Sequence, residues 1–414
     1  MSPFGDFMYI CIILNLEFNF NKNSELATMK THFILILIFS FNLSFSQNKL
    51  PVVKSNTKEV KIIENKELIT TWNLAPEAKP DIYISGKNTK FRNIKLVTDI
   101  DSIEINLLPK QEFDFIVLLN QKDSCYTRFK SPGTKNFANE KPSKKTIIPF
   151  VATVDNNIQT QAILNKKDSV KLLFDTGATG FYLKKTAIRQ FLNPEGKKIT
   201  MNDISDNHFK ISDLEWEHQK VYPLETTGDC CGGMYGWDIF DGKVVEIDYD
   251  TNLMTVSTKT PKISKDYEKF EMEMMKEHFC INVELESDNK RYKTRFLFDT
   301  GYQKSVMLDN KLMNNIGFPI QNLPVIKKSV MYNSQNQEIP VNIVSVEKLI
   351  FGKYTLENIP AQVNSYSQPA GYATNFLGGE ILKRFNIILD FKNNTVYLKP
   401  NHLFKESYLE NNKS

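Results

Sequence analysis

Two Asp-Thr-Gly triplets are the residues of this chain best suited to chemistry. One lies in "LLFDTGATGFYL" (residues 172–183) and the other in "FLFDTGYQKSVML" (residues 296–308). Their aspartates, Asp175 and Asp299, each follow an apolar run that we expect to form a buried strand. A carboxyl group at the end of a buried strand is costly unless it is hydrogen-bonded or has a chemical role. The two aspartates are therefore the first candidates for a functional site.

The residues that follow each aspartate suit a tight turn that holds a carboxylate. Gly177 permits the turn and brings backbone N–H groups close to the carboxylate, and the Thr176 hydroxyl can hydrogen-bond locally. If two such loops face each other across a twofold axis, identical residues meet near that axis. Two carboxyl groups within about 3 Å share a proton, so one can activate a water while the other polarises a carbonyl. This chemistry cleaves an amide with no metal and no cofactor, and we expect neither.

A repeat in the sequence supports such an axis. We expect one copy over residues 147–260 and a second over residues 268–403. The longest match has no gap: "YGWDIFDGKVVEIDYDTNLMTV" starts at Tyr235 and "LGGEILKRFNIILDFKNNTVYL" starts at Leu377. Both read as an apolar residue with glycine, a short helical stretch, a strand, a polar turn and a closing strand. A strand led by two lysines, "KKITM" and "KKSVM", also recurs, so we predict a duplicated, mainly β unit.

The paired motifs resemble those of the aspartic protease superfamily. "FDTGAT" and "FDTGYQ" are each followed by two apolar residues and glycine, "MYG" and "FLG". Each copy has roughly 110 to 130 residues, nearer a retropepsin-like unit than a full pepsin lobe. The chain is similar to exported bacterial aspartyl proteases with two such copies. The resemblance implies two tandem retropepsin-like β-barrel domains that form a pseudo-twofold pair, preceded by a small β domain.

The resemblance also implies roles for single residues. Asp175 and Asp299 would be the catalytic dyad. A β-hairpin flap would close over the substrate, formed by residues 327–344 and, in the first copy, by residues 199–214. The threonines would brace the two loops across the axis, the glycines would allow their turns, and one hydroxyl would support the neighbouring aspartate. These supporting residues are Thr176, Gly177, Thr179, Thr300 and Gly301.

The second loop departs from the family pattern at two positions. Gln303 stands where Ser or Thr is expected, and Tyr302 stands where a small residue is usual. An amide can still donate a hydrogen bond, so we predict an aspartic-type endopeptidase that binds an extended peptide and hydrolyses it. The alternative left open by this loop is a non-catalytic peptide-binding protein that retains the fold.

Other candidate residues favour no competing chemistry. We interpret Asp248 and Asp390 as structural turn residues. The five histidines are scattered and suggest neither a metal site nor a catalytic triad. The cysteines beyond Cys11 fit no zinc pattern, and we expect one disulfide or none. The net charge of +4 gives no reason to expect nucleic acid as a partner.

The N-terminal segment has the pattern of a secretory signal. "MKTHFILILIFSFNLSFSQN" starts at Met29 with a basic residue, continues with an apolar run and ends in small residues. We predict a signal peptide over residues 29–46, cleaved after Ser46, with a short buried or anchoring helix as the alternative. Residues 1–28 are a doubtful leader that we interpret as the product of an upstream start codon. The mature chain is then expected in the periplasm or outside the cell, with no stable membrane insertion.

Short β-type runs between turn residues predict an N-terminal β domain over residues 47–140. The Pro-, Gly-, Asn- and Lys-rich stretch over residues 130–145 has the composition of a linker. The whole mature chain is expected to be a monomer that contains an internal pseudo-dimer.

Overall fold

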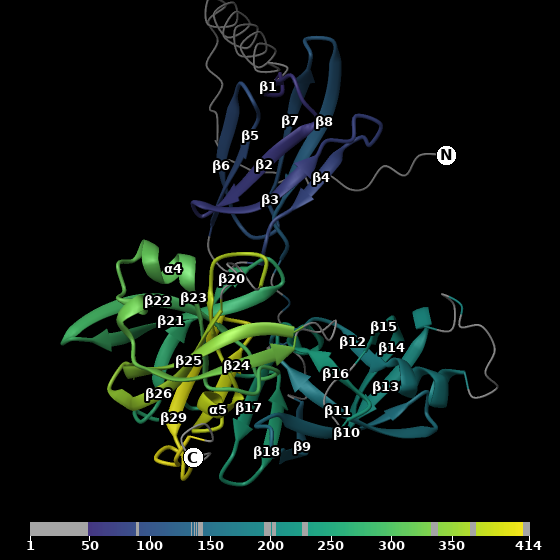
Figure 1. Cartoon of the computed structure of the whole chain (residues 1–414). Coiled ribbons are helices and arrows are strands. Elements are labelled where there is room, and N and C mark those ends of the chain that lie inside the picture. Colours follow the sequence, from purple (N-terminus) through teal and green to yellow (C-terminus); the bar gives the residue numbers. More distant parts are fainter. Residues whose placement is uncertain are drawn as a thin grey trace, which may run out of the picture. The chain divides into compact units, whose positions relative to one another are not determined.

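The computed structural model describes residues 49–87, 91–133, 135, 137, 139, 144–193, 200, 204–225, 231–332, 338–364 and 370–408. The predicted leader and signal peptide, "KKITM" apart from Thr200, and Cys230 lie outside these residues. All elements below belong to the compact unit of residues 51–414. They are almost entirely strands, so the prediction of a mainly β fold is confirmed (Figure 1).

The first eight strands form two four-stranded sheets, which we call the N-terminal sandwich. One sheet has the order β1 (Val52–Ser55), β7 (Glu112–Leu119), β8 (Asp123–Lys130) and β4 (Asp81–Ile84). The other has the order β3 (Glu67–Asn73), β2 (Glu59–Glu64), β5 (Arg92–Val97) and β6 (Ser102–Leu107). Buried and less buried residues alternate along β5, as expected for a strand with one face on a core. Ile94, Phe115 and Phe129 from both sheets meet in that core.

The first Asp-Thr-Gly triplet lies in a segment that we call the first segment. Its strand β11 runs parallel to β16, β16 runs antiparallel to β12, and β12 runs parallel to β15. The elements are β9 (Lys145–Ala152), β10 (Ile158–Leu164), β11 (Asp168–Asp175), β12 (Phe181–Lys184), α2 (Lys185–Ala187), η1 (Ile188–Leu192), β13 (Asn207–Ile211), β14 (Leu214–Gln219), β15 (Val221–Leu224), β16 (Gly233–Gly236), η2 (Trp237–Phe240), β17 (Val244–Asp248) and β18 (Leu253–Ser257).

The second segment repeats this pairing order around the second triplet. Here β22 runs parallel to β27, β27 runs antiparallel to β23, and β23 runs parallel to β26. The elements are β19 (Glu268–Glu271), β20 (Glu273–Met275), β21 (His278–Ser287), β22 (Lys290–Phe298), β23 (Val306–Asp309), α4 (Asn310–Asn315), η3 (Ile320–Asn322), β24 (Val325–Tyr332), β25 (Glu338–Phe351), β26 (Tyr354–Asn364), β27 (Asn375–Leu377), α5 (Gly379–Leu382), β28 (Phe385–Asp390) and β29 (Thr395–Pro400).

One antiparallel pair of strands joins the two segments. β17 pairs with β28 inside a sheet whose strands follow the order β9-β18-β17-β28-β29-β19. Glu246 lies opposite Ile388, and these two residues are equivalent in the gap-free match of the two segments. Val245 lies opposite Leu389 and Ile247 opposite Ile387, so the register is symmetric about the central pair. A single buried cluster that contains residues of both segments packs around this junction.

The predicted turn roles of Asp248 and Asp390 fit the structure. The Asp248 carboxylate accepts hydrogen bonds from the backbone N–H groups of two following residues, at 2.9 and 3.2 Å. Asp390 accepts the equivalent pair at 3.2 and 2.9 Å. Both carboxylates therefore hold the turn between two antiparallel strands.

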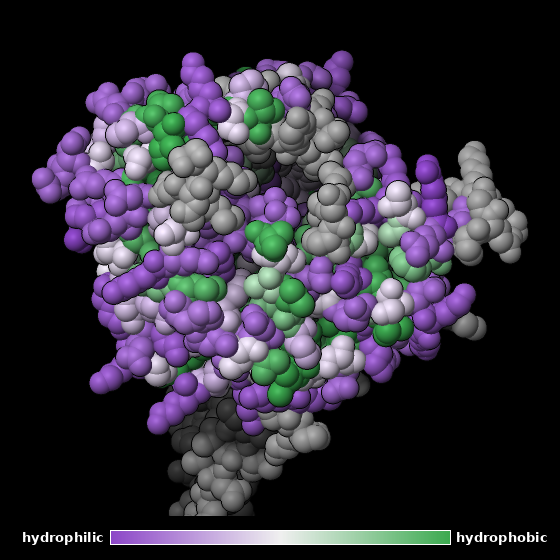
Figure 2. Space-filling model, turned by 60° about the horizontal axis from the view of Figure 1, so that its bottom comes forward, coloured by the Kyte–Doolittle hydropathy of each residue, from purple (hydrophilic) through white to green (hydrophobic). Residues whose placement is uncertain are grey.

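One face of the molecular surface is shown in Figure 2. The face in Figure 2 is mostly hydrophilic, and its hydrophobic residues gather in small groups. Among the described residues, no helix is long and apolar enough to cross a membrane. The buried apolar side chains of this unit pack against one another in internal clusters.

Replacing Arg92 by Ala tests the deeply buried ion pair between Arg92 and Glu64. Arg92 and Glu64 are 3% and 2% exposed and form a salt bridge within the N-terminal sandwich. The substitution leaves the Glu64 charge buried without its partner, and we expect a loss of about 3–5 kcal/mol in the free energy of unfolding. Denaturant unfolding measures this loss. Lys95→Ala, which breaks an exposed pair with Glu104, is the control and should cost much less. Equal losses would contradict the prediction.

Candidate active site

Two glycines set the backbone around the Asp-Thr-Gly loops. Gly236 ends β16 and lies opposite Asp175, while Gly378 follows β27. A Cβ atom on Gly236 would lie 2.3 Å from the Ala178 carbonyl oxygen, and one on Gly378 would lie 2.0 Å from that of Lys304. Since no side chain fits at such distances, the loop backbone can cross the neighbouring strand only at glycine. This explains why each triplet is accompanied by two apolar residues and glycine.

The two loops hold each other through their threonines. The Thr176 hydroxyl donates to the Phe298 carbonyl oxygen at 2.6 Å, and the Thr300 hydroxyl donates to that of Phe174 at 2.8 Å. Each hydroxyl oxygen also accepts the backbone N–H of the opposite threonine, at 3.0 Å in both cases. Both side chains are buried. These four hydrogen bonds fix the end of β11 against the end of β22.

The aspartate side chains meet at this junction. The two carboxyl groups lie close enough for each to shift the pKa of the other. Asp175 also accepts the Gly177 N–H at 2.8 Å, and Asp299 accepts the N–H groups of Gly301 and Tyr302, both at 2.9 Å. A Cβ atom on Gly177 would lie 2.7 Å from the Asp299 carboxyl carbon, and one on Gly301 would lie 2.3 Å from an Asp175 oxygen. The glycine of each loop therefore makes room for the carboxyl group of the other.

The surroundings favour a proton on this carboxyl pair. Burial raises the pKa of Asp175, although the N–H of Gly177 opposes that effect. Burial, and then the charge of Asp175, raise the pKa of Asp299 well above its usual value. Two adjacent carboxyl groups cannot both ionise easily, so the first proton leaves much more readily than the second. The pair can thus offer one acidic and one basic oxygen at the same time.

The unusual residues of the second loop have partners of their own. The Tyr302 hydroxyl donates to the Gln362 side-chain oxygen at 2.6 Å, while its backbone N–H binds Asp299. The Gln303 amide donates to the Asn157 side chain at 3.4 Å. The Thr179 hydroxyl donates to the Glu277 carboxylate at 3.3 Å, and its expected support of the neighbouring aspartate stays a prediction. The departures therefore leave the backbone donors of Asp299 in place.

Two residues that the sequence did not single out brace the loops. The Asn157 amide donates to the carbonyl oxygens of Thr300 and Gly301, at 2.8 and 3.2 Å. The His278 ring lies beside the backbone of Gly177. Burial lowers the pKa of His278, which favours the neutral ring at this position. Each segment thus supports the loop of the other segment.

These two bracing residues occupy equivalent positions. Gln159 pairs with Leu173 and Cys280 pairs with Leu297, and both leucines stand two residues before an aspartate. The residues two places before Gln159 and Cys280 are the bracing asparagine and histidine. The signal in the sequence is only a polar residue just ahead of an apolar strand. Because the two copies use different residue types there, comparison of the copies does not reveal it.

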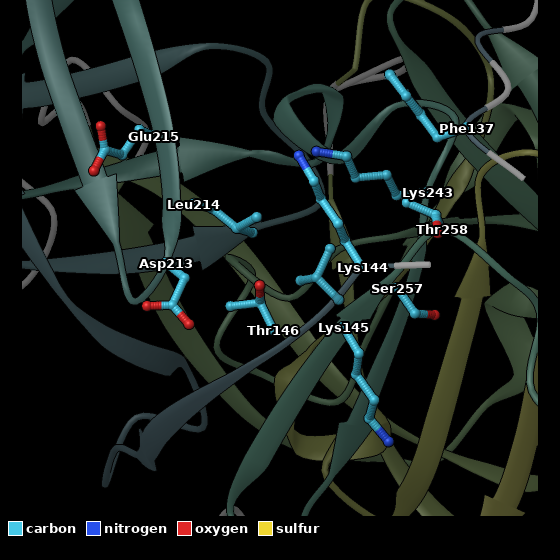
Figure 3. Close-up of a pocket in the computed structure, with 11 residues that line it drawn as sticks. Phe137, Lys144, Lys145, Thr146, Asp213, Leu214, Glu215, Lys243, Ser257 and Thr258 are labelled. Carbon is cyan, nitrogen blue, oxygen red and sulfur yellow. The ribbon is translucent and has the colours of Figure 1, made fainter. Parts of the chain in front are cut away.

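A separate hollow of about 570 Å³ lies away from the aspartates. The residues that line it include three lysines, Lys144, Lys145 and Lys243, and the acidic residues Asp213 and Glu215 (Figure 3). Charges of both signs at its edge favour no single class of ligand. The aspartate pair remains the candidate site.

Replacing Thr300 by Val tests the contact between the loops. The change removes one hydroxyl and leaves the Thr176 N–H and the Phe174 carbonyl buried without a partner. We expect a loss of about 2 kcal/mol or more in the free energy of unfolding, measured with denaturant. Thr127→Val is the matched control, because its buried hydroxyl donates to one carbonyl, that of Cys125. A loss no larger than that of the control would contradict the role of Thr300.

Replacing Asp299 by Asn tests the shared proton through stability. A raised pKa means that the folded wild type binds more protons than the unfolded chain above about pH 4, so its stability falls as the pH rises through that raised pKa. The variant lacks this loss, and its unfolding midpoint should rise relative to wild type between acid and neutral pH. Asp114→Asn should show the opposite trend, because the Arg128 hydrogen bond lowers the pKa of Asp114. Parallel trends in the two variants would refute the assignment.

Comparison with known proteins agrees with this geometry. Residues 282–381 match the family model of aspartyl proteases. The matched stretch contains Asp299 with its loop and Gly378 with the strand that precedes it. A search of curated proteins finds no match to the chain. The match shows that this part of the chain is similar to aspartyl proteases.

Proposed function

We propose that this protein is an exported aspartic endopeptidase that hydrolyses peptide bonds with a water activated by Asp175 and Asp299. The single observation that supports it most is the juxtaposition of the two carboxyl groups, each of which lies against the glycine of the other loop. The aspartyl protease match over residues 282–381 supports the same chemistry.

The arrangement suits general acid–base hydrolysis. The ionised carboxylate accepts a proton from a water bound between the two groups, while the protonated carboxyl donates its hydrogen bond to the carbonyl oxygen of the substrate. The water oxygen then adds to the carbonyl carbon. The proton taken from the water passes to the leaving nitrogen as the C–N bond breaks. The N–H groups of Gly177, Gly301 and Tyr302 keep the carboxyl oxygens oriented.

The two segments would act as tandem retropepsin-like domains, over residues 147–260 and 268–403. Their shared order of strand pairing and the symmetric register of β17 with β28 support this reading. The substrate would lie between them as an extended chain. The hairpin of β24 and β25 would be the flap of one domain, and residues 199–214 would form the flap of the other. Residues 333–337, between β24 and β25, lie outside the described part of the chain.

Export and assembly complete the proposal. The motif over residues 29–46 supports secretion or a periplasmic location, and the mature protein would work as a monomer with an internal pseudo-dimer. Its partners would be peptides or proteins, as the family match suggests. The N-terminal sandwich would accompany the catalytic segments into the same compartment.

Single replacement of either aspartate tests the function. Asp175→Asn and Asp299→Asn should each lower kcat/KM for peptide hydrolysis by about 10³-fold or more, because each carboxyl group has its own proton-transfer role. The measurement uses a diverse peptide library between about pH 3 and pH 8. Asp248→Asn is the control, since its carboxylate holds a turn, and it should retain hydrolysis. Hydrolysis that survives either dyad change would overturn the proposal. Peptides that bind but stay intact with the wild type would instead favour a non-catalytic binding protein.

A further inference from the structure

We propose that Ile69 of the N-terminal sandwich forms part of the wall of the substrate cleft beside Asp299 and limits the size of the apolar side chain accepted there. This inference rests on the proposed function and names a specificity determinant for the same site. The assigned ligand is a peptide with an apolar residue next to the scissile bond.

The first observation is a separate apolar cluster that mixes the N-terminal sandwich with the second segment. Ile69 lies on β3, the last strand at one edge of its sheet, and is 7% exposed. It packs among buried residues of the second segment, and Tyr302 packs against the same group. We call this group the Ile69 cluster. Its buried members are Ile69, Met275, Cys280, Leu297, Met307, Tyr372 and Phe376.

The Ile69 cluster borders the aspartate pair. Leu297 stands two residues before Asp299 at the end of β22, so the two side chains project from the same face of the chain. The Tyr302 N–H binds Asp299, and its ring lies 6.0 Å from that of Phe376. Tyr372 also lies near the aspartate pair. Its pKa is raised mainly by burial and then by Cys280, and the charge of Asp299 raises it further. The cluster therefore continues the site on the Asp299 side.

Polar contacts hold Ile69 in this position. Glu67 is two residues before Ile69 on β3, and its carboxylate lies 3.2 Å from an Arg295 guanidinium nitrogen. Arg295 is 9% exposed and also donates to the Ala373 carbonyl oxygen at 2.8 Å. Arg92 of the sandwich donates to the Met274 carbonyl oxygen at 3.0 Å. Because Arg295 and Arg92 are buried, their hydrogen bonds to backbone carbonyl groups fix the geometry of this contact.

At the equivalent positions of the first segment, the residue that packs against the strand is more exposed to solvent. Tyr182 pairs with Met234 there, as Met307 pairs with Phe376 in the second segment. The Tyr182 ring packs on Tyr222 at 5.3 Å, and Tyr222 is 41% exposed. Tyr182 also lies near Asp175, whose charge is one of the smaller causes that raise its pKa. The cleft thus has an open aromatic side and a side closed by the sandwich, so the two sides should differ in the residue that they accept.

The test varies Ile69 in the full mature chain. We measure kcat/KM for peptides with Ala, Val, Leu or Phe on either side of one scissile bond. Ile69→Ala should shift the preference on one side toward the larger residues by about tenfold or more and leave the other side unchanged. Ile69→Phe should shift the same side toward Ala. Leu68→Ala is the matched control, because Leu68 is the neighbour on β3 and is 53% exposed, and it should change neither preference.

Two outcomes would overturn the inference. One is an unchanged preference in a folded Ile69→Ala variant, with folding checked by its unfolding midpoint. The other is an equal rise in kcat/KM for all peptides, which would make the sandwich an inhibitory cover and not a subsite wall.

Peptide affinity separates this inference from the proposed function. Binding of the same peptides is measured with Asp299→Asn, alone and combined with Ile69→Ala. A shifted binding preference supports the wall even if the wild type hydrolyses nothing, and an unshifted one counts against it.

Discussion

The reciprocal hydrogen bonds of Thr176 and Thr300 are the constraint on which the candidate site depends. Two carboxyl groups placed side by side repel each other once both ionise, so a site of this kind opens unless something else holds the strand ends together. The hydroxyl of each threonine donates a hydrogen bond to a carbonyl group of the other segment and accepts one from the backbone N–H of the opposite threonine. The contact is buried, and its four hydrogen bonds join the two loops into one unit, which we call the floor of the site.

The backbone around this floor is nearly symmetric, whereas the side chains are not. The strand pairings, the crossing glycines and the register of β17 with β28 follow one pattern in both segments. The bracing side chains are an amide in Asn157 and an imidazole in His278. Asp299 accepts the N–H groups of Gly301 and Tyr302, whereas Asp175 accepts that of Gly177 and also interacts with the backbone of Gly301. Such differences allow the two aspartates to hold different protonation states within one symmetric frame.

Features fixed by local backbone geometry could be predicted from the sequence. Apolar runs ending in Asp-Thr-Gly predicted the strand ends, and Gly236 and Gly378 followed from the repeat, because only glycine fits where a loop crosses a strand. The mainly β fold followed from the short alternating runs. Apart from the pairing of the two Asp-Thr-Gly loops, which the repeat and the family resemblance implied, long-range contacts could not be predicted. The sequence does not indicate that the partners of Ile69 lie on β21, β22 and β27, since those contacts join segments far apart in the chain.

The departure at Tyr302 connects the floor of the site to the N-terminal sandwich. In the resembling family a small residue occupies this position, and a small residue would leave space above Phe376. Here the Tyr302 ring fills that space, its hydroxyl binds Gln362, and Ile69 packs on the same cluster. Tyr302 of the second loop and Ile69 of the distant strand β3 therefore pack against the same apolar cluster. If the proposed function holds, the N-terminal sandwich helps to determine which substrate side chains the site accepts. Tyr302 of the second loop supplies part of the apolar surface on which Ile69 of the sandwich packs.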